Sequence, residues 1–360
     1  MTILVTGCAG FIGSNFVHTW LENFNEKIVN VDKLTYAGNL SNLESVLKDS
    51  RHLFVHADMA NREVMDKLLE THQPRAVINF AAESHVDRSI HAPIDFIQTN
   101  VLGTYHLLEA VRHYWNLLDD REVHSLEKPT KSSFRFIQIS TDEVFGSLEP
   151  GDPGFTEKHN YEPNSPYSAS KASADHLVRA WHHTYGLPVL TTHCSNNYGP
   201  YHFPEKLIPL IIHNALSGKS LPIYGDGLQV RDWLYVKDHC LAIIEVLNKG
   251  QVGETYNIGG CNEKTNLEVV KTICQSLDQL RPLDKGSYLD QMTFVKDRPG
   301  HDRRYAIDAH KIMDTLQWSP KESFDSGIQK TIEWYLKNAK WVHEIINGTY
   351  KDWITKQYLQ

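Results

Sequence analysis

Short apolar runs alternate with longer amphipathic stretches through the first half of the chain. The apolar runs are rich in β-branched and aromatic residues and predict buried strands at residues 3–5, 28–31, 53–58, 76–80, 134–139 and 189–193. Helical stretches lie between them, at residues 14–24, after Asn61, at 101–115 and at 167–185. Strands that alternate with helices in this way predict an α/β fold with a doubly wound parallel sheet.

Beyond residue 195 the alternation becomes irregular. Strand patterns remain at residues 222–224, 229–236 and 255–258, and helical patterns at 267–280, 309–316 and 324–339. We therefore predict a sheet domain over residues 1–195 and, mainly from residues 196–360, a smaller mixed α/β domain that closes over the sheet edge. The pattern also allows the chain to cross back to the sheet around residues 229–258.

Composition narrows the class of protein. The chain has 360 residues, of which 41% are hydrophobic and 22% charged, and its net charge is −8. A general nucleic-acid binder needs a surplus of Lys and Arg that is absent here, and no apolar run is long enough for a membrane span or a signal segment. The five cysteines form no Cys-x-x-Cys pair and the histidines match no ligand spacing. We expect a cytoplasmic protein without metal, nucleic acid or membrane partners.

The first junction between strand and helix carries three glycines, Gly7, Gly10 and Gly13. Glycines at this spacing allow a tight turn and a close approach to a pyrophosphate at a helix N-terminus. Asp32 ends the next strand, where a carboxylate accepts from ribose hydroxyls and repels a 2′-phosphate. The pattern predicts NAD rather than NADP, although neighbouring Lys33 weakens that preference.

Further polar and small residues follow the later strands. Asp58 comes after the third strand and is placed to accept from an adenine amino group. Ala81 and Ala82 follow the fourth strand and would let a cofactor lie close. For Glu83 and Asp87, a place in a polar loop is as good an explanation as a role at the cofactor.

Two clusters carry candidate chemistry. Thr141, Asp142 and Glu143 stand at the carboxyl end of a predicted strand, the edge of an α/β sheet where ligands bind. Tyr167 and Lys171 are four residues apart, so on a helix their side chains share one face. A neighbouring ammonium favours the phenolate, which could take a proton from a substrate hydroxyl while a hydride leaves the same carbon.

With these motifs the chain resembles the extended short-chain dehydrogenase/reductase superfamily and, within it, the dTDP-glucose 4,6-dehydratase family. The matching segments are residues 6–13, 32–39, 81–89, 140–144, 167–171, 194–201, 231–233 and 297–302. Cys8 stands where the family usually has Gly, and Phe145 where Tyr is common. The resemblance implies a Rossmann-type sheet, a tightly bound NAD that is regenerated in each turnover, and dTDP-glucose as the substrate.

The resemblance also implies roles for the candidate residues. Tyr167, assisted by Thr141 and Lys171, would take the proton of the glucose 4-hydroxyl as hydride leaves C4. Glu143 would remove the C5 proton, Asp142 would protonate the departing 6-hydroxyl, and the hydride would return to C6. The sequence leaves open which of the two carboxyl groups is protonated.

The same resemblance assigns the binding residues. The cofactor set is Gly7, Gly10, Phe11, Ile12, Gly13, Asp32, Lys33, Leu34, Thr35, Asp58, Met59, Phe80, Ala81, Ala82, Glu83, Ser84, Thr99, Tyr167, Lys171 and Asn197. The substrate set is Ser84, Thr141, Asn196, Lys206, Leu207, Pro222, Ile223, Tyr224, Arg231, Asn266, Asp297, Arg298, Pro299, Gly300 and His301. Arg231 and Arg298 are candidate diphosphate ligands, although each could be a surface charge. Family members are homodimers, which here would pair helices 101–115 and 170–185.

Two other functions stay open. One is a sister enzyme, either a 4-epimerase or a dehydratase for another nucleotide sugar; an epimerase would not need the Asp142-Glu143 pair. The other is a catalytically silent NAD-binding regulator, which often lacks the Tyr or the Lys that this chain retains. The preference for thymine over uracil rests on resemblance alone.

Overall fold

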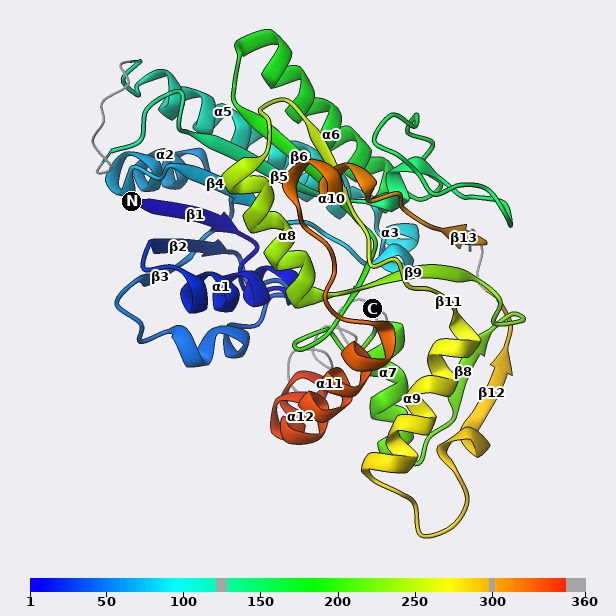
Figure 1. Cartoon of the computed structure of the whole chain (residues 1–360). Coiled ribbons are helices and arrows are strands. Elements are labelled where there is room, and N and C mark those ends of the chain that lie inside the picture. The colour runs from blue at the N-terminus through cyan, green and yellow to red at the C-terminus, as the bar shows by residue number, and fades with distance from the viewer. Residues whose placement is uncertain (121–127, 298–301, 348–360) are drawn as a thin grey trace.

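A seven-stranded parallel sheet forms the centre of the computed structural model, which describes residues 1–120, 128–297 and 302–347 (Figure 1). The strand order is β10-β6-β5-β4-β1-β2-β3. The bounds are β1 Thr2–Thr6, β2 Lys27–Asp32, β3 His52–His56, β4 Ala76–Asn79, β5 Arg135–Thr141, β6 Val189–Cys194 and β10 Thr255–Ile258. All strand pairs are parallel, so their carboxyl ends meet at one edge.

Helices cover both faces of this sheet. Successive side chains of a buried strand point to opposite faces, so the apolar side chains on each face need a layer of helices to cover them. Ile3 and Val5 of β1 pack in one apolar layer with helices α1, α8 and α10, whereas Leu4 packs in the other with α2, α5 and α6. The bounds are α1 Phe11–Asn23, α2 Arg62–His72, α5 Thr104–Asn116, α6 Pro166–Tyr185, α8 Val236–Lys249 and α10 His310–Leu316. The predicted α/β class with a doubly wound sheet is confirmed.

Local sequence signals set several helix ends. Asn61 caps α2, where its side chain accepts from the Val64 amide, as the sequence predicts. Ser165 forms a capping box with Ser168 at the start of α6, and Gly186 ends that helix with a φ of 75°. The helix predicted from residue 101 differs at its start, since a π-helical segment, η2 (Ile97–Gly103), precedes α5. Short helices α3 (Val86–His91) and α4 (Pro93–Phe96) lead into it.

The second part of the chain is built on small sheets. Strands β11, β9 and β13 lie in that order with β7 beside β9, and β8 pairs with β12. The bounds are β7 Asn196–Tyr198, β8 Leu221–Tyr224, β9 Val230–Tyr235, β11 Glu263–Thr265, β12 Met292–Val295 and β13 Arg304–Tyr305. Four helices share the apolar core of this part: α7 Leu207–Leu216, α9 Asn266–Leu280, α11 Phe324–Lys337 and α12 Ala339–Asn347. Two 3₁₀ segments, η1 (Leu40–Val46) and η4 (Tyr288–Gln291), lie outside the main elements.

The two parts interlace along the chain. Strand β10 pairs with β6 at the edge of the large sheet, and α8 covers the sheet beside α1. Ile312 and Trp318, far along the chain, pack in the same layer. A single boundary at residue 195 therefore does not separate the two cores.

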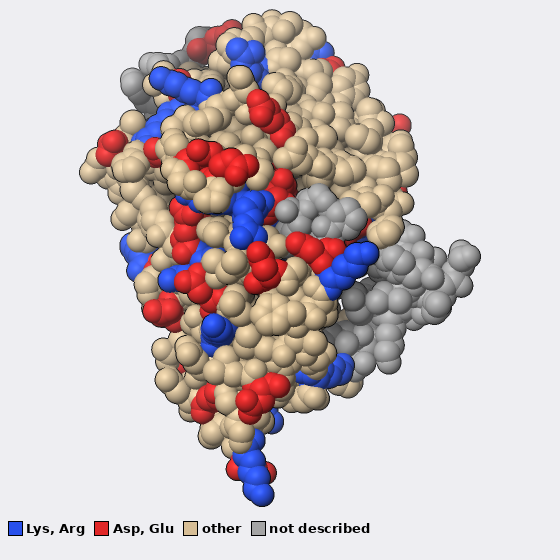
Figure 2. Space-filling model, turned by 90° about the vertical axis from the view of Figure 1, so that its right-hand side faces the viewer, with Lys and Arg blue, Asp and Glu red and all other residues tan. Residues whose placement is uncertain are grey.

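On the face shown in Figure 2, acidic and basic side chains are interspersed, without a continuous patch of lysine and arginine. Within the described parts of the chain, no helix has the length and apolarity that a membrane crossing requires. All five cysteines are free thiols, four of them buried.

Candidate active site

A cavity of about 460 Å³ opens at the carboxyl ends of the large sheet and is closed on its far side by the second part of the chain. Many residues of the cofactor prediction line it: Gly7, Gly10, Phe11, Ile12, Gly13, Asp32, Lys33, Thr35, Asp58, Met59, Phe80, Ala81, Ala82, Glu83, Ser84, Thr99 and Asn197. So do the five catalytic candidates and, from the substrate prediction, Asn196, Lys206, Leu207, Pro222, Tyr224, Arg231 and Asn266.

A few predicted residues lie away from this wall. Leu34 packs against the sheet core, and its backbone amide donates to Asp32. Ile223 is buried in the core of the second part, because alternate residues of β8 point in opposite directions. Asp297 accepts from Gln229 and is not among the lining residues. Arg298, Pro299, Gly300 and His301 lie outside the described residues.

The glycine turn forms a cradle that larger residues would fill. A Cβ on Gly7, whose φ is +70°, would lie 2.5 Å from the Ala81 amide nitrogen. A Cβ on Gly13 would lie 2.2 Å from the Gly7 carbonyl oxygen. Helix α1 begins directly after this turn with no side chain capping its first amides, which leaves N–H groups for an anionic ligand. The turn therefore fits the pyrophosphate of a dinucleotide.

Asp32 and Lys33 are both held in place. The Asp32 carboxylate accepts from the Ala9 amide at 2.9 Å and from the Leu34 amide at 2.8 Å, which ties the glycine turn to the end of β2. Lys33 donates to Thr99 at 3.0 Å, and its ammonium lies 3.6 Å from the carboxylate of Asp58. Because the lysine is engaged in this way, it weakens the case for NAD less than its position in the sequence suggests.

Tyr167 and Lys171 reach the cavity from one face of α6, as their spacing predicts. Burial raises the pKa of Tyr167 well above its usual value, with further raising by Glu143 and Cys194, while a hydrogen bond with Thr141 lowers it. Lys171 donates to the Ile139 carbonyl at 2.7 Å, and burial lowers its pKa. Thr141 and Lys171 are thus the two neighbours from which the sequence analysis expects help for the phenolate, and both line the cavity with Tyr167.

The two carboxyl groups follow directly from β5 on the 3₁₀ helix η3 (Asp142–Phe145), which the Thr141 hydroxyl caps by accepting from the Glu143 amide. Asp142 is 1% exposed, whereas Glu143 is half-buried. Burial, then Glu143 and Asp232, raise the pKa of Asp142 well above its usual value. Burial therefore favours the protonated form of Asp142, a preference that the sequence leaves open.

A cluster of polar and aromatic residues at the cavity was not assigned a role in the sequence analysis. Arg88 donates to Glu205 at 2.8 Å, and His85 lies 3.5 Å from the same carboxylate. The Arg88 guanidinium also lies over the Tyr36 ring at 3.5 Å, and burial raises the pKa of Tyr36. Arg88 and Glu205 are 117 positions apart, so no local pattern pairs them.

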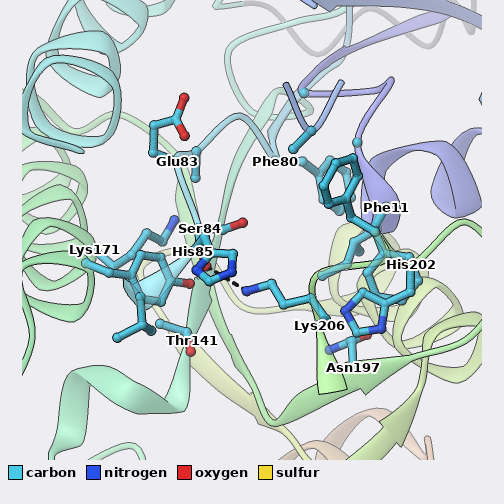
Figure 3. A pocket seen from close by; sticks show the side chains of 18 of the residues that line it. Phe11, Phe80, Glu83, Ser84, His85, Thr141, Lys171, Asn197, His202 and Lys206 are labelled. Carbon is cyan, nitrogen blue, oxygen red and sulfur yellow. Dashed lines mark hydrogen bonds between the residues drawn. The ribbon is translucent and has the colours of Figure 1, made fainter. Parts of the chain in front are cut away.

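The second part of the chain supplies cations and aromatic rings. Lys206 donates to the Ser84 carbonyl at 3.1 Å across the cavity (Figure 3). Arg231 donates to the Asp302 carbonyl at 3.0 Å, and its guanidinium lies over the Tyr305 ring at 4.4 Å. Within the described residues no group of three potential metal ligands occurs. The cavity therefore combines a dinucleotide cradle, an acid, a base and basic groups suited to a diphosphate.

His202 is a further wall residue that the sequence did not single out. Its ring stacks on Phe11, next to the glycine turn, at 4.2 Å between centroids (Figure 3). Burial lowers the pKa of His202 to about 3, so its imidazole is neutral. It acts there as a flat packing surface.

Comparison with known proteins agrees with this geometry. Residues 4–331 match the family model described as GDP-mannose 4,6 dehydratase. The chain is 58% identical to the dTDP-glucose 4,6-dehydratase of Shigella flexneri over 99% of both chains, and 59% identical to that of Xanthomonas campestris pv. campestris over 97% of both.

Solved structures give the same picture. A dTDP-glucose 4,6-dehydratase from Bacillus anthracis in complex with NAD has a TM-score of 0.83 at 48% identity, covering 96% of this chain and 99% of its own. One from Streptomyces venezuelae, also with NAD bound, has a TM-score of 0.85 at 42% identity, covering 96% and 100%. A UDP-glucose 4-epimerase from Thermotoga maritima follows with a TM-score of 0.79 at 29% identity, covering 94% and 100%. With its sheet, its cavity and its full-length relatives, the chain belongs to the dTDP-glucose 4,6-dehydratase family of the extended short-chain dehydrogenase/reductase superfamily.

Proposed function

We propose that the chain is an NAD-dependent hydro-lyase that converts dTDP-glucose to dTDP-4-keto-6-deoxyglucose and water. One observation carries the proposal: Tyr167, Asp142 and Glu143 line the same cavity as the glycine turn. The cofactor cradle is formed by Gly7, Gly13 and the N-terminus of α1, beside Asp32. When bound there, NAD supplies a temporary acceptor for the C4 hydride and returns that hydride to C6.

Tyr167 begins the reaction by accepting the proton of the sugar 4-hydroxyl. Burial raises the pKa of Tyr167 and so favours the phenol, which must lose its proton before it acts as a base. The Thr141 hydroxyl eases this loss through its hydrogen bond. The Lys171 ammonium, one helical turn along α6, would favour the charged form.

The two carboxyl groups complete the elimination. The 4-ketone acidifies the C5 proton, which the half-buried Glu143 removes as a base. Asp142, kept protonated by burial, donates its proton to the departing 6-hydroxyl, so water leaves. The adjacent acid and base hold different protonation states because their surroundings differ.

The experiment that tests this function uses the purified protein with dTDP-glucose and no added NAD. Loss of one water in the product, seen by mass spectrometry, is the expected result. A product that keeps its mass but is inverted at C4 would assign an epimerase instead, the activity named for the similar fold from Thermotoga maritima. Absence of turnover by a protein that contains NAD would assign a regulator.

A homodimer and a cytoplasmic location complete the proposal. Apolar side chains that a monomer leaves exposed run along the segments before and within α5: Ile90, Ile94, Ile97, Leu102 and Tyr105. A second copy of the chain would cover them. The free cysteines suit a reducing compartment. The product would feed deoxysugar synthesis, such as rhamnose for cell-surface polysaccharide.

A further inference from the structure

A buried polar cluster lies directly behind the reactive side chains and has no part in the mechanism above. Its centre is Asp175 of α6, which is 4% exposed and follows Lys171 by one helical turn. The Ser140 hydroxyl donates to Asp175 Oδ2 at 2.6 Å. His193 Nε2 lies 3.2 Å from the same oxygen. Three elements, β5, β6 and α6, thus converge on one carboxylate.

His193 contacts this carboxylate through one of its two ring nitrogens. His193 Nε2 faces both Asp175 and the Tyr161 hydroxyl, the latter at 2.8 Å. His193 Nδ1 is buried, and the described residues offer it no hydrogen-bond partner. A protonated imidazole would place an N–H donor at Nδ1 without an acceptor, which is unfavourable. The geometry therefore favours the tautomer with its proton on Nε2, where Asp175 Oδ2 can accept it. Asp175 Oδ1 is buried too and has no hydrogen-bond partner among the described residues.

The Asp175 carboxylate acts electrostatically on the ammonium of Lys171, one helical turn before it on α6. The ammonium donates to the Ile139 carbonyl, a neutral acceptor, so this bond brings no opposite charge. Burial lowers the pKa of Lys171, and Asp175 is the main group that raises it again, followed by Cys194. Because burial raises the pKa of the Cys194 thiol, that thiol brings no charge, and Asp175 is the effective partner.

The cluster also supports the helix that bears the acid and the base. Phe145, the last residue of η3, packs with its ring centroid 4.9 Å from that of His193 and 5.4 Å from that of Tyr161. A change in the cluster can therefore act on the active site in two ways, through charge at Lys171 and through packing at Phe145. The test has to separate them.

We propose that Asp175 is a positioning residue: held by Ser140 and His193, it supplies the buried negative charge that keeps the Lys171 ammonium protonated in the active site. This inference rests on the proposed function, because the lysine acts by favouring the phenolate of Tyr167. It predicts that the charge of Asp175, and not merely its shape, sets the pH range of the enzyme.

Asp175→Asn keeps the shape of the side chain and removes its charge. Lys171 then loses its proton at a lower pH, so the alkaline limb of the kcat/KM profile moves down by about one pH unit. At the acidic limb the lysine is still charged in the variant and still favours the phenolate, so that limb stays in place and the profile narrows from its alkaline side only. The groups that face the pair are Asp175 and Cys194 around Lys171, and Glu143, Asp142, Cys194 and Thr141 around Tyr167.

Tyr161→Phe is the matched control, since it removes one hydroxyl from the same cluster and no charge. It should lower the unfolding temperature without moving either limb. Asp175→Ser is a second neutral variant with a smaller side chain, and either folded variant decides the question. Superimposable profiles of wild type and a folded Asp175 variant would overturn the inference. So would failure of both variants to fold while Tyr161→Phe folds, because Asp175 would then be a structural anchor.

A second measurement keeps this inference distinct from the proposed function. The pH at which the holoenzymes release bound NADH, followed by its fluorescence, needs no sugar substrate. Lys171 lines the cavity, so earlier loss of its charge should bring release of the anionic cofactor to a lower pH in Asp175→Asn than in wild type. A wild type that is silent toward dTDP-glucose would contradict the function alone, whereas identical release curves would contradict the role of Asp175.

Discussion

Asp142 and Glu143 are neighbours in the chain, yet only one of them is fully buried. Both side chains line the cavity, but Asp142 is buried and Glu143 is half-buried. In the proposed mechanism, this difference in solvation lets one carboxyl serve as the acid and the other as the base.

Glu143→Gln tests the base. The variant keeps the size of the side chain but cannot accept the C5 proton, so water loss should fall by about 10²-fold or more. Oxidation at C4 needs Tyr167 and not Glu143, so bound NADH should still accumulate and absorb in the near ultraviolet.

The C5 proton itself gives the direct measurement for Glu143→Gln. Solvent deuterium should no longer enter C5 in the variant, as followed by NMR of the recovered sugar. Asp142→Asn is the matched control, because it should retain exchange at C5 while losing elimination. Unaltered exchange in Glu143→Gln would refute the assignment of the base.

Asp142→Asn should also be more stable than the wild type above neutral pH. A carboxyl whose pKa is raised by folding contributes stability below its unfolded pKa and loses it as pH rises through the folded value. The neutral amide escapes that loss. The gain should be about 1–3 kcal/mol at alkaline pH and should vanish near pH 4. Thermal unfolding across this pH range measures it, and a gain independent of pH would contradict the explanation.

At this scale the sequence located the reactive residues but not their surroundings. Motifs identify Tyr167, Lys171 and the carboxyl pair because their spacing along the chain is the signal. Arg88 and Glu205 pair only after folding, and no spacing reveals that. Ile223 was assigned to the wall by resemblance, yet the alternation of β8 turns it into the core.

At the scale of elements, the C-terminal helix is joined to the cofactor turn. The Trp341 indole of α12 donates to the Asn42 side chain at 2.9 Å, and Asn42 in turn donates to the Ala9 carbonyl at 2.8 Å. Residues 299 positions apart in the chain therefore share one buried link to the glycine turn.

Trp341→Phe should loosen that link. The ring still fills the site, but the Asn42 carbonyl oxygen loses its donor, at a cost of about 1 kcal/mol. If this cost falls on the cofactor-binding conformation, the dissociation constant for NAD should be roughly five-fold higher in the variant than in the wild type. Equilibrium titration of cofactor-free protein with NAD measures the change.

Trp334→Phe is the control for this link. Trp334 packs against Trp341 with ring centroids 5.0 Å apart, but it is not among the hydrogen-bond partners that the structure gives Asn42. It should lower stability and leave NAD affinity as in the wild type. Equal loss of affinity in both variants would show that general packing of α12, and not the hydrogen bond, supports the turn.

Elements of the first half follow the sequence closely, because strands buried on both faces are continuous apolar runs. The second half was harder to predict. Helices α7 and α8 were both missed, and Val236, the first residue of α8, was placed at the end of a predicted extended run. Helix α8 is apolar where it lies against the sheet, and the pattern there merges with that of the preceding strand β9. Only the packing of α8 against α1 in the folded chain distinguishes this helix from strand β9.

At the scale of the whole molecule, interlacing of the two parts ties the cavity to the core. Segments of the second half, α8, β10 and α10, complete the large sheet layer, and the chain then returns to close the cavity. The two halves of the wall are therefore fixed by one shared apolar layer. This architecture explains how distant segments of the chain meet at one cofactor site.

The exposed apolar band along α4, η2 and α5 is not covered by any of the residues that the structure describes. Ile94 is 59% exposed, and Ile97, Leu102 and Tyr105 are each at least 40% exposed. A stable dimer interface covers about 800 Å² on each partner, which a band of large side chains on neighbouring helices can supply. Leu102→Glu would place an unpaired carboxylate in such an interface, which strongly opposes association.

We therefore expect Leu102→Glu to sediment as a monomer at concentrations where the wild type is a dimer. The side chain is exposed in the single chain, so the variant should keep its fold, as circular dichroism would show. Phe294→Glu is the control: Phe294 is 58% exposed on β12, at the opposite end of the molecule in Figure 1, and its substitution should leave the dimer intact. A wild type that sediments as a monomer, or a dimer that only Phe294→Glu disrupts, would place the interface elsewhere.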